Sequence, residues 1–178
     1  LTGGLGYIGS HISVCLLNSG FEVIVIDNLS NSSNKVLKKI KSITKKEIIF
    51  YEADIRDNNS LREIFRKNEI KSVIHLAGLK SVNESLDFPQ KYIDNNVFGS
   101  KNLINVMNEF NCKKMIFSSS ASVYGESQKA PFEETSPTQP TNPYGETKLE
   151  IENYLHDLSK MDKDWEIIAL RYFNPLGA

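Results

Sequence analysis

Short apolar runs rich in β-branched residues alternate with amphipathic stretches along most of the chain. An apolar run of about four to eight residues predicts a buried strand, whereas apolar positions three or four apart predict a helix. The strands expected on this basis are Glu22–Asp27, Glu47–Ala53, Ser72–Ala77, Lys114–Ser119 and Glu166–Tyr172. The helices expected with them are Gly6–Asn18, Ser60–Lys67, Pro89–Phe110 and Pro143–Leu158. This alternation predicts an α/β fold, namely a Rossmann-type doubly wound parallel sheet with helices on both faces.

Two segments stand apart from this pattern. Residues 35–46 contain six lysines, which we expect on the solvated face of a helix, with Val36, Leu37, Ile40 and Ile43 turned inward. Residues 124–142 are polar and hold Gly125, Pro131, Pro137 and Pro140, a composition that predicts a loop. Because long loops in compact domains are often functional, and this one leads directly to Tyr144, we place it near an active site.

The charge balance narrows the possible partners. The chain has 21 Lys and Arg against 22 Asp and Glu, so it lacks the positive excess that nucleic acids or anionic membranes attract. No apolar run reaches the roughly 18 to 20 residues that span a bilayer, and the first residues do not resemble a signal peptide. Cys15 and Cys112 lack metal-ligand spacing and are expected to be reduced thiols. We therefore expect a cytoplasmic protein without a nucleic-acid partner, a membrane or a metal.

Three glycines, Gly3, Gly6 and Gly9, stand at the start of the first predicted helix. Glycines there let backbone N–H groups approach a phosphate, and the helix dipole favours the negative charge. A lone triplet also occurs in ordinary strand-to-helix turns. The next strand ends at Asp27, where a carboxylate can accept hydrogen bonds from a ribose and would repel a 2′-phosphate, and no Arg follows in residues 28–34. The pattern predicts a dinucleotide site that favours NAD over NADP.

Further polar or small residues follow the next strands. Asp54 and the pair Ala77 and Gly78 come after two of them, and Ser118 to Ser120 end the fourth. Because ligands of open parallel sheets bind at the carboxyl ends of the strands, we expect these residues to border one crevice.

Tyr144 and Lys148 are four residues apart in the last predicted helix, so they share one face. An isolated tyrosine is only about 0.1% ionised at pH 7, and a nearby ammonium together with a cationic nicotinamide would favour its phenolate. A buried Tyr beside a snorkelling Lys is the alternative interpretation of the spacing. With Ser120 at a strand end, the pair predicts redox chemistry on an alcohol.

With these motifs, nearly the whole chain resembles the N-terminal, NAD-binding part of the UDP-glucose 4-epimerase family, within the extended short-chain dehydrogenase/reductase superfamily. The segments that carry the resemblance are Thr2–His11, Asp27–Asn31, His75–Lys80, Asp94–Val97, Phe117–Gly125, Asn142–Lys148 and Leu170–Pro175.

The resemblance implies a role for each matching residue. Tyr144 would be the base and acid, Lys148 would hold the nicotinamide ribose and tune Tyr144, and Ser120 would bond the sugar hydroxyl. With the glycines and strand ends above, the expected NAD site comprises Gly3, Gly6, Tyr7, Ile8, Gly9, Asp27, Asn28, Leu29, Ser30, Asn31, Ser32, Asp54, Ile55, Leu76, Ala77, Gly78, Leu79, Lys80, Asn95, Ser118, Tyr144, Lys148 and Phe173. The expected UDP-sugar contacts are Lys80, Ser120, Tyr144 and Asn174.

The activity implied is the interconversion of UDP-glucose and UDP-galactose. The hydrogen on carbon 4 of a hexose is not acidic, so oxidation must precede inversion, with NAD regenerated in each cycle. Dehydratases of the superfamily place an Asp-Glu pair directly after the Ser or Thr, whereas Ala121 and Ser122 stand here. Another NAD-dependent sugar-nucleotide epimerase or oxidoreductase, or a non-catalytic NAD-binding regulator, is the alternative.

The ends of the chain are unusual for this fold. A dinucleotide-binding glycine loop ordinarily follows a buried strand, yet here it begins at the third residue. The chain stops at Ala178, just after the last predicted strand. We therefore expect residues 1–178 to be one NAD-binding domain of a longer protein, without its first strand and its C-terminal substrate domain. The resemblance implies a homodimer for the intact protein.

Overall fold

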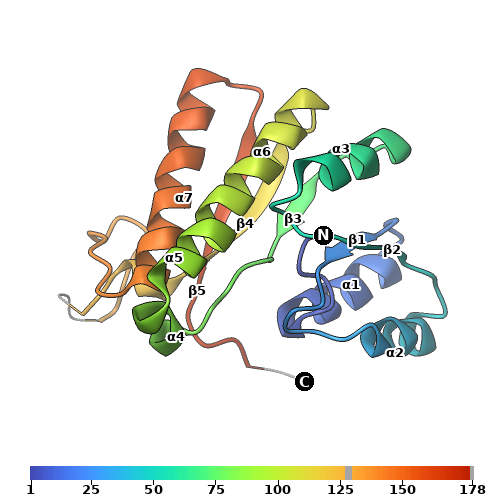
Figure 1. The fold of residues 1–178 in the computed structure, drawn as a ribbon, viewed down its shortest axis with the longest axis horizontal. Coiled ribbons are helices and arrows are strands. Elements are labelled where there is room, and N and C mark those ends of the chain that lie inside the picture. The colour runs from blue at the N-terminus through green and yellow to red at the C-terminus, as the bar shows by residue number, and fades with distance from the viewer. Residues whose placement is uncertain (127–129, 177–178) are drawn as a thin grey trace.

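The fold is a parallel α/β arrangement in which each of the strands β1 to β4 is followed by one or more helices (Figure 1). The computed structural model describes residues 1–126 and 130–176. The strands are β1 (Ile24–Asp27), β2 (Ile49–Glu52), β3 (Val73–His75), β4 (Lys114–Ser120) and β5 (Glu166–Tyr172). The α-helices are α1 (Tyr7–Asn18), α2 (Lys35–Thr44), α3 (Asn58–Lys67), α4 (Val82–Asp87), α5 (Pro89–Tyr92), α6 (Gly99–Glu109) and α7 (Pro143–Met161). A π-helix, η1 (Ile93–Phe98), and a 3₁₀ turn, η2 (Ala121–Val123), complete the elements.

All strand pairs are parallel, and Thr2 joins two groups of strands. β1 pairs with β2 in one group, and β3, β4 and β5 lie in that order in the other. Thr2 forms single bridges to Ile26 on β1 and to His75 on β3. The spatial order is therefore β2, β1, Thr2, β3, β4, β5, with Thr2 at the position where the predicted topology has a central strand. The Rossmann-type prediction and its five strands are confirmed.

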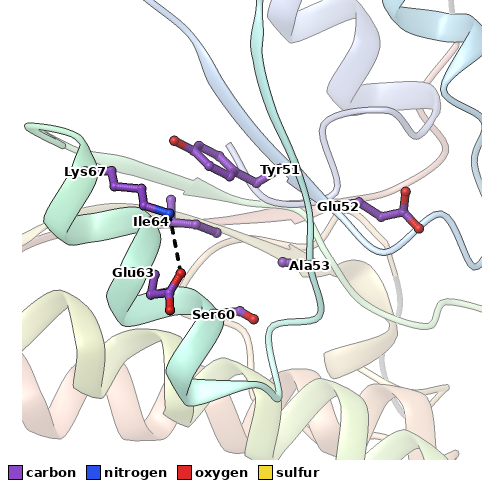
Figure 2. A pocket seen from close by; sticks show the side chains of 7 residues that line it. All are labelled: Tyr51, Glu52, Ala53, Ser60, Glu63, Ile64 and Lys67. Atoms are coloured by element: carbon purple, nitrogen blue, oxygen red, sulfur yellow. Dashed lines mark hydrogen bonds and ion pairs between the residues drawn. The ribbon is translucent and has the colours of Figure 1, made fainter.

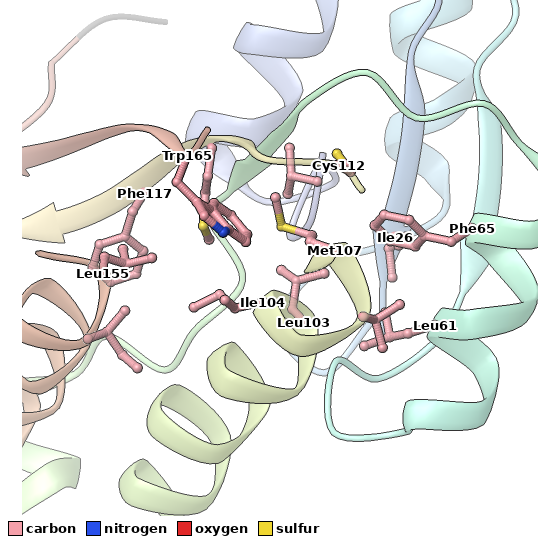
Figure 3. Close-up of a cluster of buried hydrophobic side chains, with 14 of the residues drawn as sticks. Ile26, Leu61, Phe65, Leu103, Ile104, Met107, Cys112, Phe117, Leu155 and Trp165 are labelled. Atoms are coloured by element: carbon pink, nitrogen blue, oxygen red, sulfur yellow. The ribbon is translucent and has the colours of Figure 1, made fainter. Parts of the chain in front are cut away.

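Helices cover both faces of this arrangement. Neighbouring residues of a strand point to opposite sides of the sheet, so each face has its own buried cluster. Val25 belongs to a buried cluster with Leu17 of α1 and Ile40 of α2. The adjacent Ile26 belongs to the larger cluster formed with α3, α6 and α7 (Figure 3). Its largest fully buried side chains include Leu61, Leu103, Ile104, Met107, Met115, Phe117, Ile151 and Leu155. The two buried clusters thus hold the strands, and with them their carboxyl ends, in place.

The inward face of α2 differs from the prediction at one position. Ile40 is buried and Val36 and Leu37 are half-buried, but Ile43 is 63% exposed. Thr44, four residues after Ile40, takes the buried position, and its hydroxyl donates to the Ile40 carbonyl at 2.9 Å. The expectation that Ile43 points inward is wrong because the buried face of α2 follows Ile40 and Thr44, and Ile43 lies at the edge of that face.

The predicted long helix over Pro89–Phe110 is continuous but not uniform. Its middle, η1, has π-helical hydrogen bonding between α5 and α6. Such segments are rare and often occur at functional sites. The short helix α4 was not expected, because six residues show too little periodicity. Its signal was the Ser81-x-x-Glu84 capping pattern, in which the Ser81 hydroxyl accepts a bond from the Glu84 N–H at 3.2 Å.

The predicted loop between Tyr124 and Asn142 is confirmed for its described residues, which form turns and extended segments. Gly125 has a φ of +69°, and a Cβ there would overlap the Gln139 carbonyl. The buried Tyr124 hydroxyl donates to the Glu133 carbonyl at 3.0 Å and so holds the loop to the end of β4. Across the described part of the chain, no helix combines the length and apolar character that a bilayer crossing requires.

Candidate functional site

Glycine stands at each of the three loop positions for a different reason. Gly3 has a φ of +67°, and a Cβ there would lie 2.7 Å from the Ala77 nitrogen. A Cβ on Gly9 would overlap the Gly3 carbonyl and approach the Gly4 Cα to 2.7 Å. A Cβ on Gly6 would meet one atom within 4 Å, the Gly3 carbonyl at 3.4 Å, so this face of the loop is open. Gly3 and Gly9 are required by the turn itself, whereas Gly6 leaves room for a ligand.

The open face coincides with the N-terminus of α1. Gly6 is the N-cap residue without a side-chain cap, and the first turn contains no acidic residue. The first N–H groups of a helix have no partner within the helix, and the helix dipole adds partial positive charge there. This arrangement fits the pyrophosphate of a dinucleotide. Tyr7, the first helical residue, is 50% exposed, and Ile8 beside it is half-buried.

Asp27 connects the glycine loop to the loop after β1. One carboxylate oxygen accepts the Leu5 N–H at 3.0 Å, and the other accepts the Leu29 N–H at 3.0 Å and the Ser32 hydroxyl at 2.8 Å. A carboxylate offers about four acceptor positions, so capacity for a ribose hydroxyl remains. Asp27 therefore caps the turn after β1 and is also suited to the ribose, as expected. Leu29 has a φ of 58° in this loop, which also contains Asn28, Ser30 and the exposed Asn31.

Asp54 joins the loops after β1 and β2. Its carboxylate forms a two-pronged pair with Arg56, at 2.9 and 2.7 Å, and accepts the Asn28 amide at 3.0 Å. The hydrogen bonds from Arg56 hold the pKa of Asp54 well below its ordinary value, so the group is charged. Ile55 differs from expectation, because its side chain is 4% exposed and packs beneath Gly99. Burial of its side chain leaves only the Ile55 backbone for ligand contact.

The segment after β3 is held from two sides. The Leu76 N–H donates to the Thr2 carbonyl at 3.1 Å, and the Ala77 N–H donates to the Thr2 hydroxyl at 3.3 Å. Leu79 exchanges two hydrogen bonds with the Asn96 side chain, at 2.8 and 2.9 Å. Between them, a Cβ on Gly78 would stand 3.6 Å from the Lys148 Nζ. Gly78 and Lys80 are exposed, so this predicted stretch borders the lysine and remains accessible.

The start of α7 is fixed by caps from two elements. The Asn142 side chain accepts the Gly145 N–H at 2.8 Å, and the Ser85 hydroxyl of α4 accepts the Tyr144 N–H at 3.2 Å. Lys148 Nζ lies 5.9 Å from the Tyr144 ring centroid and donates to the Ser118 carbonyl at 2.7 Å. The expected juxtaposition of Tyr144 and Lys148 is therefore present, at the carboxyl end of β4.

The protonation of this pair is governed first by burial. Burial lowers the pKa of Lys148 to about 8, with the charge of Glu152 acting in the opposite direction. Burial also raises the pKa of Tyr144, against a hydrogen bond with Ser120. The protein groups thus do not make Tyr144 acidic on their own. The ammonium was expected to do so in part, but it donates to the Ser118 carbonyl instead of the phenol.

His75 and Asn96 are buried polar residues that the sequence analysis missed. His75 lies between the Thr2 hydroxyl, at 2.6 Å, and the Ser100 hydroxyl, at 2.8 Å. Asn96, presented by η1, also donates to the Thr147 hydroxyl of α7 at 3.2 Å. Together they connect Thr2, β3 and α7 beneath the site. The available signal was a polar residue ending an apolar run and two adjacent asparagines in an otherwise amphipathic helix.

The buried His75 is expected to make the stability of the fold sensitive to acid. Burial, with a contribution from Lys148, lowers the pKa of His75 from 6.5 to about 3, so the folded imidazole is neutral. Below pH 6.5 the unfolded chain binds the extra proton, so stability falls as the pH decreases toward 3. We expect His75 to remove about 2 kcal/mol of stability at pH 5. Urea denaturation of the native protein and of His75→Gln at pH 7 and pH 5 measures this loss in the free energy of unfolding. If both proteins lose the same free energy between pH 7 and pH 5, His75 is not the group responsible.

The remaining predicted residues lie at the ends of β4 and β5 and in η1. The Ser120 hydroxyl caps η2 by accepting the Ser122 N–H at 3.1 Å. Asn95 is half-buried in η1. Phe173 is 59% exposed, with its ring centroid 6.3 Å from that of Tyr124, and Asn174 beyond it is also exposed. Phe173 therefore groups with Tyr124 and with Phe132 of the loop after β4.

A separate small pocket lies between β2 and α3 (Figure 2). Its walls include Tyr51, Glu52 and Ile64, and Glu63 pairs with Lys67 at its rim. None of the sequence-predicted site residues lines it. Among residues 1–126 and 130–176, no three His, Cys, Asp or Glu side chains are grouped so as to hold a metal ion.

Comparisons with known proteins agree with this geometry. The sequence model of the "NAD dependent epimerase/dehydratase family" matches residues 1–178. The chain is 52% identical to the UDP-glucose 4-epimerase of Bacillus subtilis (strain 168) and 50% identical to that of Dictyostelium discoideum, covering 100% of this chain and 52% of each relative. A crystal structure of the Bifidobacterium longum UDP-glucose 4-epimerase in complex with NAD+ and UDP superposes with a TM-score of 0.97 at 47% identity, over 99% of this chain and 53% of that one. The chain thus spans about half the length of these relatives. Because the family match extends over every residue, the chain belongs to the NAD dependent epimerase/dehydratase family.

Proposed function

We propose that the protein interconverts UDP-glucose and UDP-galactose by transient oxidation at carbon 4, with NAD bound. The observation that carries the proposal is the Tyr144–Lys148 pair against the end of β4, with Ser120 beside Tyr144. The names of the similar proteins and the ligands in the Bifidobacterium structure support it. The whole protein's activity is proposed here from the half that this chain represents.

The residues present fit a dinucleotide. The open face at Gly6 and the start of α1 would hold the pyrophosphate, Asp27 would accept an adenosine ribose hydroxyl, and Lys148 would hold the nicotinamide ribose. When bound, oxidised NAD supplies a two-electron acceptor for the alcohol and a positive ring beside Tyr144. The other predicted NAD residues are proposed as further cofactor contacts, Ile55 through its backbone alone.

Tyr144 would take the proton of the carbon 4 hydroxyl and return it at the end of the cycle. Its half-buried, neutral resting state suits a group that must also act as an acid, since the phenol holds its proton until positive charge is nearby. Ser120, the last residue of β4, would bond the same hydroxyl and align it. Lys148, with a pKa of about 8, is mostly protonated at neutral pH and supplies one of the positive charges. Lys80 and Asn174 are proposed as further UDP-sugar contacts.

Epimerisation is favoured over dehydration by the residues after Ser120. Elimination of water needs an acid and a base near carbons 5 and 6 of the sugar. Ala121 and Ser122 of η2 stand in the sequence where dehydratases of the superfamily have an Asp-Glu pair, and neither side chain is an acid or a base at neutral pH. By resemblance to the family, we further propose that the intact protein is a cytoplasmic homodimer.

The proposal is tested by supplying the intact protein with UDP-galactose. We expect UDP-glucose to form with no net change in NADH absorbance, because each cycle returns the cofactor to its starting state. Net NADH formation would instead identify a dehydrogenase. NAD binding without turnover of either sugar nucleotide would identify a regulator.

A further inference from the structure

Glu152 is a nearly buried carboxylate one helical turn beyond Lys148 on α7. Positions four apart on a helix share a face, about one 5.4 Å pitch apart. The Glu152 side chain is 10% exposed and accepts hydrogen bonds from the Ser119 hydroxyl and from Arg171, at 3.0 Å to Nε and 2.7 Å to Nη2. No role for Glu152 follows from the proposed proton path, so its burial requires another explanation.

Arg171 connects this carboxylate to the loop after β4. Its Nη1 donates to the Tyr124 hydroxyl at 3.0 Å and to the Glu134 carbonyl at 3.2 Å. Its guanidinium also lies 4.8 Å from the centroid of the Tyr124 ring. Arg171 therefore links β5, the loop after β4 and α7.

Two residues on successive turns of α7 contact successive serines of β4. Lys148 donates to the Ser118 carbonyl, and Glu152 accepts from the Ser119 hydroxyl. These two contacts help to set how far α7 lies along the strand, and the register of α7 sets where Tyr144 and Lys148 stand.

The charges around Lys148 are few. α7 contributes Tyr144 and Glu152, and β3 contributes His75, which is neutral. β5 contributes Arg171, which is paired with Glu152. β4 and η1 face the Lys148 ammonium with uncharged groups, the Ser118 carbonyl and Phe117 ring from β4 and the Asn96 amide from η1. Glu152 is therefore the negative group, among those described, that offsets the cost of burying the ammonium.

We propose that Glu152 is a positioning residue for the Tyr144–Lys148 pair: placed one turn along α7 and held by Ser119, its carboxylate keeps Lys148 charged and fixed against β4. The role acts through Lys148 and not through contact with substrate. The inference rests on the proposed function for its importance in turnover, but the charge state of Lys148 can be measured without turnover.

The test is the titration of Lys148 in the intact protein, followed by NMR of ε-¹³C-labelled lysines, with the Lys148 signal assigned through Lys148→Met. Glu152→Gln keeps the hydrogen-bonding shape but removes the charge, and we expect the midpoint to fall by about one pH unit. Arg171→Met leaves the carboxylate without its guanidinium, and we expect the midpoint to rise. Glu152→Asp retains the charge and should remain close to the native value.

Glu150→Gln is the matched control, because Glu150 lies on the same helix, is exposed and pairs with Lys101 at 2.7 Å. Its midpoint should equal the native one. The proposal is overturned if the Lys148 midpoint is unchanged in folded Glu152→Gln, or if it falls in Arg171→Met. The Arg171→Met result decides if Glu152→Gln does not fold. Shifted midpoints in a protein without epimerase activity would overturn only the proposed function.

Discussion

Replacing Tyr144 with phenylalanine is expected to lower epimerase turnover about 10²- to 10⁴-fold while NAD remains bound. The substitution removes the phenolic oxygen and nothing else, so the proton of the carbon 4 hydroxyl loses its acceptor. The ring packing should survive, since Tyr144 keeps its edge contact with Tyr92 at a centroid distance of 6.4 Å and its backbone bond to Ser85. Turnover of UDP-galactose and binding of NAD by titration measure the two effects separately.

Tyr154→Phe provides the control for this substitution. Tyr154 lies on the same helix, is half-buried and has Lys101 Nζ 5.5 Å from its ring centroid, away from β4. Its loss of a hydroxyl should leave turnover near the native rate. Near-native turnover of Tyr144→Phe would show that another group transfers the proton.

Gly9→Ala and Gly6→Ala are expected to have different effects, the first on stability and the second on NAD binding. The Gly9 methyl would be forced into the backbone of Gly3 and Gly4, where nothing flexible can yield, so we expect a loss of at least about 3 kcal/mol of stability. Gly6 has a φ of −72°, which alanine adopts freely, and its methyl would meet only an ordinary contact at 3.4 Å. Gly6→Ala should therefore fold normally and bind NAD about tenfold or more weakly, because the second glycine allows the pyrophosphate to approach the backbone.

Denaturant unfolding and NAD titration of both intact variants test this pair. Native NAD affinity in Gly6→Ala would mean that the open face of the loop is not where the pyrophosphate binds. Native stability in Gly9→Ala would mean that the turn relaxes more readily than its close contacts indicate.

Periodicity and spacing were sufficient to predict the positions of the main elements. Every apolar β-branched run became a strand, because a parallel sheet covered on both faces requires such runs. Tyr144 and Lys148 share a face because helix geometry places residues four apart together. The relation of Asp27 to the glycine loop was likewise predictable from the order of the elements.

Contacts between distant segments were not predictable in this way. The Glu152–Arg171 pair, the two hydrogen bonds of His75 and the clamp of Asn96 on Leu79 join residues that are 17 or more positions apart. Such pairings depend on how helices lie on the sheet, which no local pattern encodes. The π-helical turn that presents Asn96 is equally a product of this packing.

The amino-acid sequence alone determined the order of strands and helices, the glycine loop and the shared face of Tyr144 and Lys148, because each depends on local backbone geometry. Only the tertiary structure decided that Ile55 faces the core, that Gly6 alone of the three glycines leaves an open approach, and that Tyr144 is less acidic than its lysine neighbour suggested. The physical reason is burial, since the cost of removing a group from water depends on everything packed around it.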